Sequence, residues 1–318
     1  MVNLQQNVSL KDYSNYKIGG NAAYFLEVFS KKDLIEGIKN WHQVSLDFPE
    51  NKKKIFILGK GTNVLFSDEG FYGLIIKNSI KGIKASGNIF TASAGEEVAS
   101  LLDFCIENSL SGLEWAGGLP GTLGGAVRGN AGAFNGEIKD NLSQVESLNF
   151  KTLETIQRNN KDCKFSYRNS VFKKEAINEV IISVTFILQK QEKKEIETKT
   201  KEKIEYRKAK HPLEYPNLGS IFKNVPVEKF SAYQMKELTQ YVKNDPFPVI
   251  PAAKLIFLAG LKGERVGDVM VSEKHTNFII NMGSGKASEV KRLIGFIKDR
   301  IREQFGIELE EEIMFLPS

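Results

Sequence analysis

The sequence predicts a globular chain of mixed helices and strands, divided into two or at most three domains. Its 318 residues are 41% hydrophobic and 26% charged, which is typical of a soluble protein with a sizeable core. Segments with the two-residue period of strands and segments with the 3.6-residue period of helices occur along the whole chain. A change of composition after Gln189 marks the main domain boundary.

Short apolar segments in the first 190 residues predict a series of strands. These segments are residues 22–28, 54–58, 73–76, 89–93, 144–150 and 180–188. A helix is predicted over residues 31–41, with Ser30 as its cap. A second helix, over residues 96–108, has one apolar stripe that ends at Cys105. We therefore expect Cys105 to be a small core residue rather than a nucleophile.

The stretch from Gly117 to Gly132 is rich in glycine. It contains seven glycines, one proline and almost no charge. Because glycine accepts unusual backbone angles and lets a ligand approach the main chain, we expect a folded loop rather than the interior of a helix or strand. Exposed N–H groups in such a loop can bind an anion, although a tight structural turn has the same composition.

Residues 191–203 are almost entirely Glu, Lys and Thr, with Ile196 as the only aliphatic residue. Opposite charges four residues apart, such as Glu195 and Lys199, favour an exposed helix. Because the acids balance the bases, we expect a solvated connector rather than a nucleic-acid patch. The predicted domains are residues 1–190, with subdomains of about 1–80 and 81–190, a connector at 191–204, and residues 205–318.

The last part of the chain predicts two short helical stretches, a strand at 277–281, a long helix at 286–305 and a strand at 307–315. The long helix has a single apolar stripe. Its members are Val290, Leu293, Ile294, Ile297 and Ile301. The segment 226–250 is either a helical lid or a surface insertion.

Several classes of protein are excluded. No apolar run reaches about 18 residues and no basic and apolar leader is visible, so we expect neither a membrane span nor a signal peptide. Two cysteines, Cys105 and Cys163, are too few for a disulfide framework. His42, His211 and His275 lack metal-ligand spacing. The net charge of +5 is spread along the chain, and no nucleic-acid signature occurs. We expect a cytoplasmic protein without metal or nucleic acid.

Two glycine loops, 59–63 and 117–125, could together hold a diphosphate through backbone donors. A dinucleotide-binding fingerprint is excluded because the second loop lacks its GxGxxG spacing. A P-loop is also excluded, since Ala287 stands where the tail 283–286 must be followed by Ser or Thr. The chemistry must then come from an organic cofactor and a few polar side chains.

Three polar residues stand out. Arg168 lies in the motif FSYRNS, Ser220 in GSIFKN, and Glu312 ends an acidic run that begins at Glu308. A planar guanidinium can bind a carboxylate, and Ser220 is a small hydroxyl among groups that can bind anions. Taken alone, these residues are equally a surface ion pair, a turn serine and a solvated strand face, because such types are common on surfaces.

The motifs, taken in order, resemble those of the UDP-N-acetylenolpyruvoylglucosamine reductases, flavoenzymes of the second committed step of bacterial peptidoglycan precursor synthesis. The resemblance covers nearly the whole chain. Its blocks are YKIGG (16–20), LGKGTNVL (58–65), GLPGTLGGA (118–126), NAGA (130–133), YRNSVF (167–172), GSIFKN (219–224), AGLKG (259–263), VSEKH (271–275) and LEEEI (309–313).

The resemblance implies an α+β protein with a vanillyl-alcohol-oxidase-type FAD-binding domain of two subdomains, followed by an α+β substrate-binding domain. NADPH would reduce the bound FAD and leave, and UDP-N-acetylglucosamine enolpyruvate would then be reduced to UDP-N-acetylmuramate by a monomeric enzyme. The residues implied to bind FAD are Gly59, Lys60, Gly61, Thr62, Asn63, Gly118, Pro120, Gly121, Thr122, Gly124, Gly125, Ala126, Asn130 and Gly132.

The resemblance also implies the catalytic residues. Hydride from flavin N5 would pass to C3 of the enolpyruvyl group. The negative charge that develops at C2 then needs hydrogen-bond donors to stabilise it and a proton source. Ser220 would donate the proton, and Arg168 and Glu312 would bind and polarise the substrate carboxylate. Glu312 would have to be protonated or paired with Arg168, because facing carboxylates repel. The residues expected to contact the substrate are Tyr167, Lys210 (at the diphosphate) and Asn224.

The chain departs from the family pattern at a few positions. Val225 stands where Pro is usual, Gly129 stands where Met is common, and the segment 226–250 looks longer than the usual link. No proposed catalytic residue is lost, and the lack of a substrate-covering tyrosine loop resembles the shorter subtype. The alternatives are another FAD-dependent oxidase or dehydrogenase of the same fold, acting on a small alcohol or sugar, and a non-enzymatic flavin- or nucleotide-binding protein.

Overall fold

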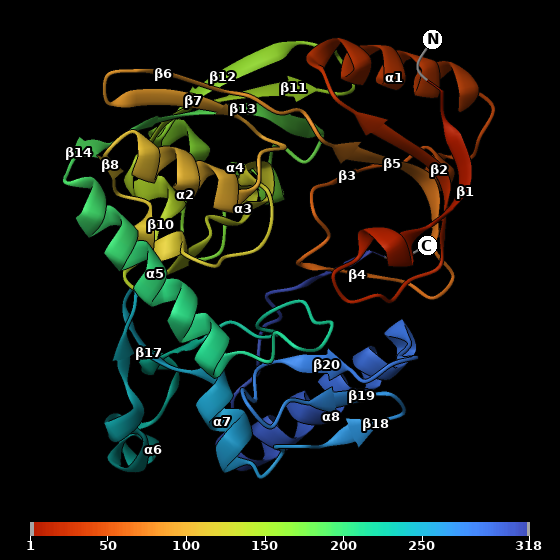
Figure 1. Ribbon diagram of the computed structural model, residues 1–318. Coiled ribbons are helices and arrows are strands. Elements are labelled where there is room, and N and C mark those ends of the chain that lie inside the picture. The colour runs from red at the N-terminus through yellow and green to blue at the C-terminus, as the bar shows by residue number, and fades with distance from the viewer. Residues whose placement is uncertain (1–2, 317–318) are drawn as a thin grey trace. The chain divides into compact units, whose positions relative to one another are not determined.

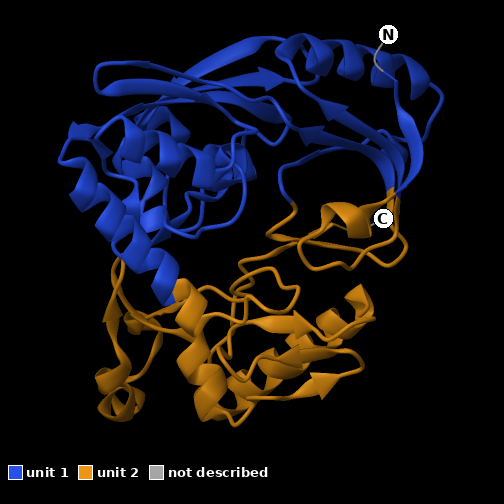
Figure 2. Cartoon of the chain, in the orientation of Figure 1, with its two compact units in different colours: residues 1–8, 22–60, 72–206 blue, residues 9–21, 61–71, 207–318 orange. Residues whose placement is uncertain are grey.

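The computed structural model describes residues 3–316 and divides the chain into two compact units (Figure 2). Unit 1 comprises residues 1–8, 22–60 and 72–206, and unit 2 comprises residues 9–21, 61–71 and 207–318. Two short N-terminal segments therefore belong with the C-terminal part of the chain. The predicted subdomain limit near residue 80 stays a prediction.

One sheet of unit 1 has the strand order β1-β2-β5-β3. Its strands are β1 (Gln5–Ser9), β2 (Asn21–Val28), β5 (Phe71–Asn78) and β3 (Ile55–Leu58). Helix α1 (Lys31–Val44) begins as predicted after Ser30, whose hydroxyl accepts a hydrogen bond from the Asp33 N–H at 3.0 Å. Its side chains Leu34, Ile38 and Trp41 are buried in a core that includes residues of this sheet.

The second sheet of unit 1 has the order β12-β11-β13-β7-β6. Its strands are β12 (Thr155–Asn159), β11 (Leu142–Asn149), β13 (Glu179–Ile187), β7 (Ile89–Ser93) and β6 (Ile83–Ser86). The helices on one of its faces are α2 (Val98–Glu107), α3 (Leu123–Gly129) and α4 (Val171–Lys174) (Figure 1). The short strand pairs are β8 (Leu110–Ser111) with β14 (Gln189–Lys190), and β9 (Gly132–Ala133) with β10 (Gly136–Glu137).

A bulge in β13 lets one strand serve two cores. Its pairing with β11 shifts by one residue at Ile182. Val180 and Ile182 before the shift pack in the core with α1, whereas Val184 and Phe186 after it pack in the core with α2 and α3. Without the bulge, these four even-numbered residues would all point to one face of the sheet. The one-residue shift turns the later two to the opposite face, so the strand contributes to both cores.

Helix α5 (Lys193–Lys210) confirms the helix predicted in the charged segment, but one side of it is packed. Ile196 and Thr200 are 1% and 4% exposed. The helix lies so close to the glycine stretch that a Cβ atom on Gly117 would stand 2.4 Å from the Thr200 carbonyl oxygen. Gly117 is therefore required by this close approach of two backbones.

Unit 2 contains three small sheets. They are β15 (Val225–Pro226), β17 (Pro248–Ile250) and β16 (Lys243–Asn244); β18 (Arg265–Val266), β19 (Val269–Val271) and β20 (Ile279–Asn281); and β4 (Val64–Phe66) parallel to β21 (Met314–Leu316). Its helices are α6 (Ala232–Leu238), α7 (Ala252–Leu258) and α8 (Ala287–Phe305). All five residues of the stripe predicted for α8 are at most 3% exposed and lie in the core of this unit.

Short 3-10 turns connect these elements. They are η1 (Leu10–Tyr13), η2 (Glu50–Lys52), η3 (Glu114–Ala116), η4 (Ile138–Asp140), η5 (Lys161–Cys163), η6 (Val227–Lys229) and η7 (Thr239–Tyr241). Among the residues described, no helix has both the length and the apolar character needed to cross a bilayer.

The segment 226–250 is anchored in unit 2. Phe230, Leu238, Val249 and Ile250 are buried, and all but Val249 belong to the main core of the unit. Tyr233, by contrast, is 78% exposed. Both ends of the segment therefore pack into unit 2, and α6 exposes the Tyr233 side chain to solvent.

The strand predicted over residues 307–315 is wrong for most of its length. Only Met314–Leu316 forms a strand, and Glu311 makes one isolated bridge to Phe222. The alternation that suggested a strand reflects burial, since Ile307, Leu309 and Ile313 are at most 5% exposed. Before Met314 the segment meets its partner at this single bridge, so the alternation does not belong to a paired strand.

The N-terminus of α8 is occupied by a side chain from far away in the sequence. The two carboxylate oxygens of Asp68 accept hydrogen bonds from the N–H groups of Ala287 and Ser288 at 2.7 and 2.9 Å. Burial raises the pKa of Asp68, but these hydrogen bonds outweigh it and hold the pKa below its ordinary value. The turn that resembles the tail of a P-loop thus binds a carboxylate of its own chain.

We expect Asp68→Ala to lower the free energy of unfolding by about 1 kcal/mol, the usual value of a helix-capping side chain. Because the pKa of Asp68 is lowered in the folded state, this stabilisation should be complete near pH 7. It should be lost as the pH falls below the ordinary carboxyl range and through the lowered pKa. Denaturant titrations at pH 7 and at about pH 3 measure both effects. The exposed Asp47→Ala is the control, and an equal loss in both variants at pH 7 would contradict the cap.

Candidate active site

The two glycine loops meet within unit 1. A Cβ atom on Gly59 would lie 2.4 Å from the Thr122 hydroxyl oxygen, so the first loop touches the second at its centre. Lys60, the next residue, pairs with Glu97, and Glu97 itself bridges to Thr122 through the backbone. The pair lowers the pKa of Glu97, chiefly through the hydrogen bond from Lys60. Residues from three parts of unit 1 therefore share one small surface.

The second loop is held by backbone hydrogen bonds to the end of β7. Leu123 and Gly124 donate their N–H groups to the carbonyl oxygens of Glu96 and Ala94, both at 2.8 Å. The prediction that this stretch forms no helix is wrong for its second half, because Gly124 and Gly125 lie in α3. Carbonyls of the turn after β7 satisfy N–H groups at the start of this helix, which makes a helix with three glycines tenable.

The first half of the stretch is the folded loop that the sequence predicts. Gly118 and Gly121 have φ angles of 72° and 120°, a region that favours glycine. Gly118, Pro120 and Gly125 are exposed, whereas the flanking Leu123 is buried. An uncharged surface of exposed backbone beside a lysine fits a diphosphate. The residues present therefore suit the FAD that the family resemblance implies.

Two further residues implied to bind FAD have structural partners. Asn130 is fully buried, and its amide bonds to the Glu137 carboxylate, the Ser166 carbonyl and the Lys139 N–H. Gly132 lies in β9, where a Cβ atom would meet Glu137 at 2.7 Å. These positions shape the hairpin that follows α3.

Arg168 is held in an unusual backbone conformation in unit 1. Its φ angle is 54°, which is rare for a residue other than glycine and is a feature of functional sites. The guanidinium donates to the Gly132 carbonyl at 2.9 Å and lies 5.0 Å from the centre of the Tyr167 ring. Tyr167 and Arg168 are thus neighbours both in sequence and in space.

Ser220 and Glu312 are brought together in unit 2. Ser220 directly precedes Ile221, whose carbonyl oxygen accepts a hydrogen bond from the Glu312 N–H at 2.7 Å. Two residues further, the Lys223 N–H donates to the Glu310 carbonyl at 2.9 Å. The two segments therefore run side by side at the proposed catalytic residues. Arg168 belongs to the other unit.

Asn277 fixes the segment that carries Ser220. Its amide donates to the Phe222 carbonyl at 2.8 Å and accepts from the Phe222 N–H at 3.0 Å. On the other side, Asn217 accepts from the N–H of Gly219, which has a φ angle of 79°. The sequence did not single out either asparagine for this role, because a side chain that pairs with a distant backbone leaves no local pattern.

The end of the first glycine loop meets Glu312. The Asn63 carbonyl accepts from the Met314 N–H at 3.0 Å, and the Asn63 side chain donates to the Glu312 carbonyl at 3.2 Å. Gly61 has a φ angle of 66° and leaves no room for a side chain, since a Cβ atom would stand 2.0 Å from the Tyr13 carbonyl. Thr62 lies between them. These three loop residues belong to unit 2, whereas Gly59 and Lys60 belong to unit 1.

The remaining predicted substrate residues also lie in unit 2. Lys210 is exposed at the last position of α5. Asn224 follows the Ser220 segment, and its side-chain oxygen accepts from the Ala252 N–H at the start of α7 at 3.2 Å.

His211 and His275, far apart in the sequence, form a pair. Their ring centres are 5.4 Å apart, and Phe278 packs against both. Burial lowers the pKa of each to about 4, with a further contribution at His211 from His275 and at His275 from Lys243. Both rings are therefore neutral near pH 7. Within residues 3–316, no group of three His, Cys, Asp or Glu could hold a metal.

Cys105 is a core residue, as predicted. It is 1% exposed, and burial, with a smaller contribution from Glu114, raises the pKa of its thiol to about 12. Cys163 is also buried, with a pKa of about 11 for the same principal reason. Neither thiol forms the reactive thiolate at neutral pH.

Comparison with known proteins bears on both parts of the chain. The family description "FAD binding domain" matches residues 44–152, and "UDP-N-acetylenolpyruvoylglucosamine reductase, C-terminal domain" matches residues 211–316. The reductase of this name from Caldicellulosiruptor bescii is 37% identical over 96% of this chain and 88% of its own length. That from Clostridium novyi is 34% identical over 98% and 91%.

A solved structure agrees with these matches. The crystal structure of UDP-N-acetylenolpyruvylglucosamine reductase from Thermus caldophilus covers 100% of both chains, with a TM-score of 0.76 and 28% identity. The predicted α+β arrangement, with an FAD-binding domain before the reductase C-terminal domain, is confirmed, and so is FAD as the cofactor. The chain belongs to the UDP-N-acetylenolpyruvoylglucosamine reductase family of FAD-dependent oxidoreductases.

Proposed function

We propose that this protein uses NADPH to reduce UDP-N-acetylglucosamine enolpyruvate to UDP-N-acetylmuramate in peptidoglycan precursor synthesis. Family membership along 96% of the chain supports the reaction. The observation that supports the residue assignment is the hydrogen bond from the Glu312 N–H to the carbonyl of Ile221, the residue after Ser220. The chain is proposed to act as a monomer in the cytoplasm.

The glycine loops around Gly59 and Thr122, with the adjacent Lys60, would hold the diphosphate of FAD through exposed backbone groups. The bound cofactor would supply the hydride for C3 of the enolpyruvyl group. The contact of Gly59 with Thr122 supports this role, because it makes the two loops a single surface. The protein thus orients the cofactor and leaves the redox chemistry to it.

Ser220 donates the proton to C2 of the substrate. A serine hydroxyl is a weak acid, but a carbanion stabilised by a neighbouring carboxylate is a strong base, so placement decides the rate. The turn at Asn217 and the pairing of Asn277 with Phe222 support this role, since both restrict the backbone that carries the hydroxyl.

Arg168 and Glu312 bind and polarise the substrate carboxylate. A planar guanidinium matches a carboxylate with two hydrogen bonds and stabilises charge that develops next to it. The Gly132 carbonyl and the Tyr167 ring orient the guanidinium, which supports a preorganised role. Tyr167 and Asn224 contact the substrate, and Lys210 meets its diphosphate.

We expect purified protein with FAD to be yellow and to oxidise NADPH only when the enolpyruvyl sugar nucleotide is present. Absorbance of NADPH at steady state, with and without this substrate and under air, measures the dependence. The proposal would be contradicted by a colourless protein that takes up no FAD. It would also be contradicted if NADPH oxidation required oxygen and not the substrate. Oxygen dependence would favour the alternative, an oxidase of the same flavin fold.

Ser220→Ala should leave flavin reduction by NADPH unchanged and slow product formation by about 10²-fold or more, the usual scale for losing an acid. Rapid-mixing measurements of the two half-reactions separate these effects. Ser284→Ala, an exposed serine of the turn before α8, is the control. Full turnover in Ser220→Ala would remove Ser220 as the proton donor.

Gly59→Ala should weaken FAD binding about tenfold, because overpacking of roughly 1–3 kcal/mol is imposed at the Thr122 contact. Titration of the apoprotein with FAD, followed by flavin fluorescence, gives the affinity. Gly295→Ala is the matched control, since a Cβ atom on this residue of α8 meets nothing within 4 Å. If both variants bind FAD like the unchanged protein, the loop contact is not part of the cofactor site.

A further inference from the structure

The segment that carries Glu312 is crowded with like charges. Glutamates occupy positions 308, 310, 311 and 312. Carboxylates this close repel one another and would spread the segment apart if no cation lay between them. Within the described residues, backbone hydrogen bonds to Ile221 and Lys223 and a hydrogen bond from the Asn63 side chain hold it. The position of Glu312 therefore depends on what neutralises its neighbours.

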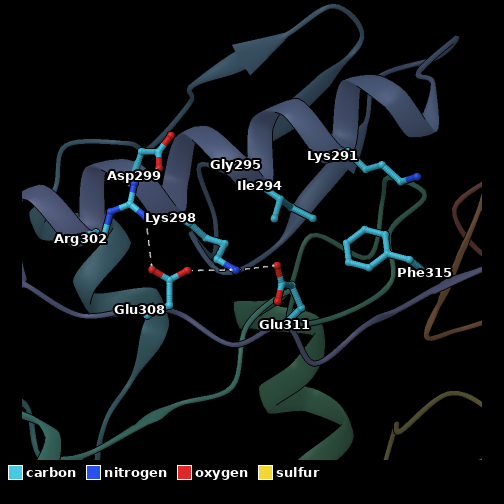
Figure 3. A pocket seen from close by; sticks show the side chains of 9 residues that line it. All are labelled: Lys291, Ile294, Gly295, Lys298, Asp299, Arg302, Glu308, Glu311 and Phe315. Carbon is cyan, nitrogen blue, oxygen red and sulfur yellow. Dashed lines mark hydrogen bonds and ion pairs between the residues drawn. The ribbon is translucent and has the colours of Figure 1, made fainter.

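Lys298 of α8 binds two of these glutamates at once. Its ammonium lies 3.2 Å from a Glu308 oxygen and 3.1 Å from a Glu311 oxygen (Figure 3). The Lys298 side chain is only 24% exposed. Burial lowers the pKa of Lys298, but the hydrogen bonds to Glu311 and Glu308 outweigh it and raise the pKa above its ordinary value. Lys223 pairs with Glu310, so each of the three flanking acids has a cation.

Lys298, Glu308 and Glu311 also line a pocket of about 380 Å³ on unit 2 (Figure 3). Two of its cations, Lys298 and Arg302, are engaged within the pocket itself, since Arg302 pairs with Asp299 and approaches Glu308 at 3.7 Å. Such paired charges are better suited to holding the protein together than to capturing a charged ligand.

Lys298 restricts the backbone next to Glu312. Glu311 directly precedes Glu312, and Lys298 holds the Glu311 carboxylate at α8. A slip of one residue against the partner segment would put a different glutamate at the position of Glu312 and would carry Glu311 away from Lys298. Lys298 opposes that slip because it binds Glu308 and Glu311 together.

We infer that Lys298 is a positioning residue for the reductase reaction, which holds Glu312 in register beside Ser220 through Glu308 and Glu311. The inference rests on the proposed role of Glu312. It acts on the step in which the enolpyruvyl substrate is reduced, and not on the reduction of the flavin by NADPH.

Lys298→Met keeps the apolar stem and removes the charge. We expect flavin reduction by NADPH to be unchanged, and reoxidation by the enolpyruvyl sugar nucleotide to slow about tenfold in its limiting rate, the scale of a small misplacement of a reacting group. Lys298→Arg should restore most of the rate because it keeps a cation that can bind two carboxylates. Hydrogen exchange of the amides of residues 307–313 should be faster in Lys298→Met and normal in Lys298→Arg.

Lys291→Met is the matched control. Lys291 lies on the same face of α8 and lines the same pocket, but its ammonium lies near the Phe315 ring, 5.9 Å from its centre. Both half-reactions and the hydrogen exchange of residues 307–313 should be unchanged in this variant. Glu311→Gln should reproduce the defect of Lys298→Met, and the double variant should be no slower than either single variant.

Glu312→Gln separates this inference from the proposed function. If Glu312→Gln reoxidises normally, the role of Glu312 fails and the inference fails with it. If Glu312→Gln is slow, Lys298→Met should add no further loss in that background. A Lys298→Met variant with normal reoxidation and normal exchange, beside a slow Glu312→Gln, would overturn the inference alone. A defect that Lys298→Arg does not restore would also overturn it.

Discussion

The pairing of residues 221–223 with residues 310–312 is the contact on which the proposed chemistry of unit 2 depends. It is short, because it is one isolated bridge made of two backbone hydrogen bonds. Its strength comes from its surroundings. Ile221 and Phe222 are buried, and Asn277 satisfies both polar groups of Phe222. A contact this small can hold the two proposed catalytic segments in place because the residues around it are buried and closely packed.

Close approach of backbones is the corresponding constraint in unit 1. Because they lack a side chain, Gly117 leaves room for α5 and Gly59 leaves room for Thr122. Gly124 packs against Ala94, just after β7. A side chain at Gly117 or Gly59 would have to displace a neighbour, whereas at Gly124 a shift of the neighbour by a few tenths of an ångström would suffice. The glycines are therefore more than sources of exposed N–H groups. They let a helix, a strand end and two loops converge on one surface, which suits an extended, anionic cofactor.

Charge is used in unit 2 to hold distant segments together. Asp68 binds the first N–H groups of α8, and Lys298 near the other end of the same helix binds Glu308 and Glu311. Exposed ion pairs contribute little on their own, but a cation that binds two acids of one segment also fixes its register. The long helix thus connects the segment of Asp68 with the segment of Glu312.

The sequence by itself determined those features that have a local period or a recognisable motif. The apolar stripe and length of α8, the cap of α1 by Ser30 and the strands at 55–58 and 89–93 follow from patterns within a few residues of one another. The ordered motifs are sufficient to indicate the family, and hence FAD. These inferences succeed because each depends on spacing along the chain alone.

Only the tertiary structure decided which distant groups meet. The bulge at Ile182, the helical state of Gly124, the pairing of His211 with His275 and the partners of Asn277 all depend on backbone groups supplied by other parts of the chain. The extended segment before Met314 shows the same limit. The alternation of apolar and charged residues in the sequence predicts its alternating burial. A strand also needs a neighbouring segment with free backbone groups, and no local sequence pattern predicts such a neighbour.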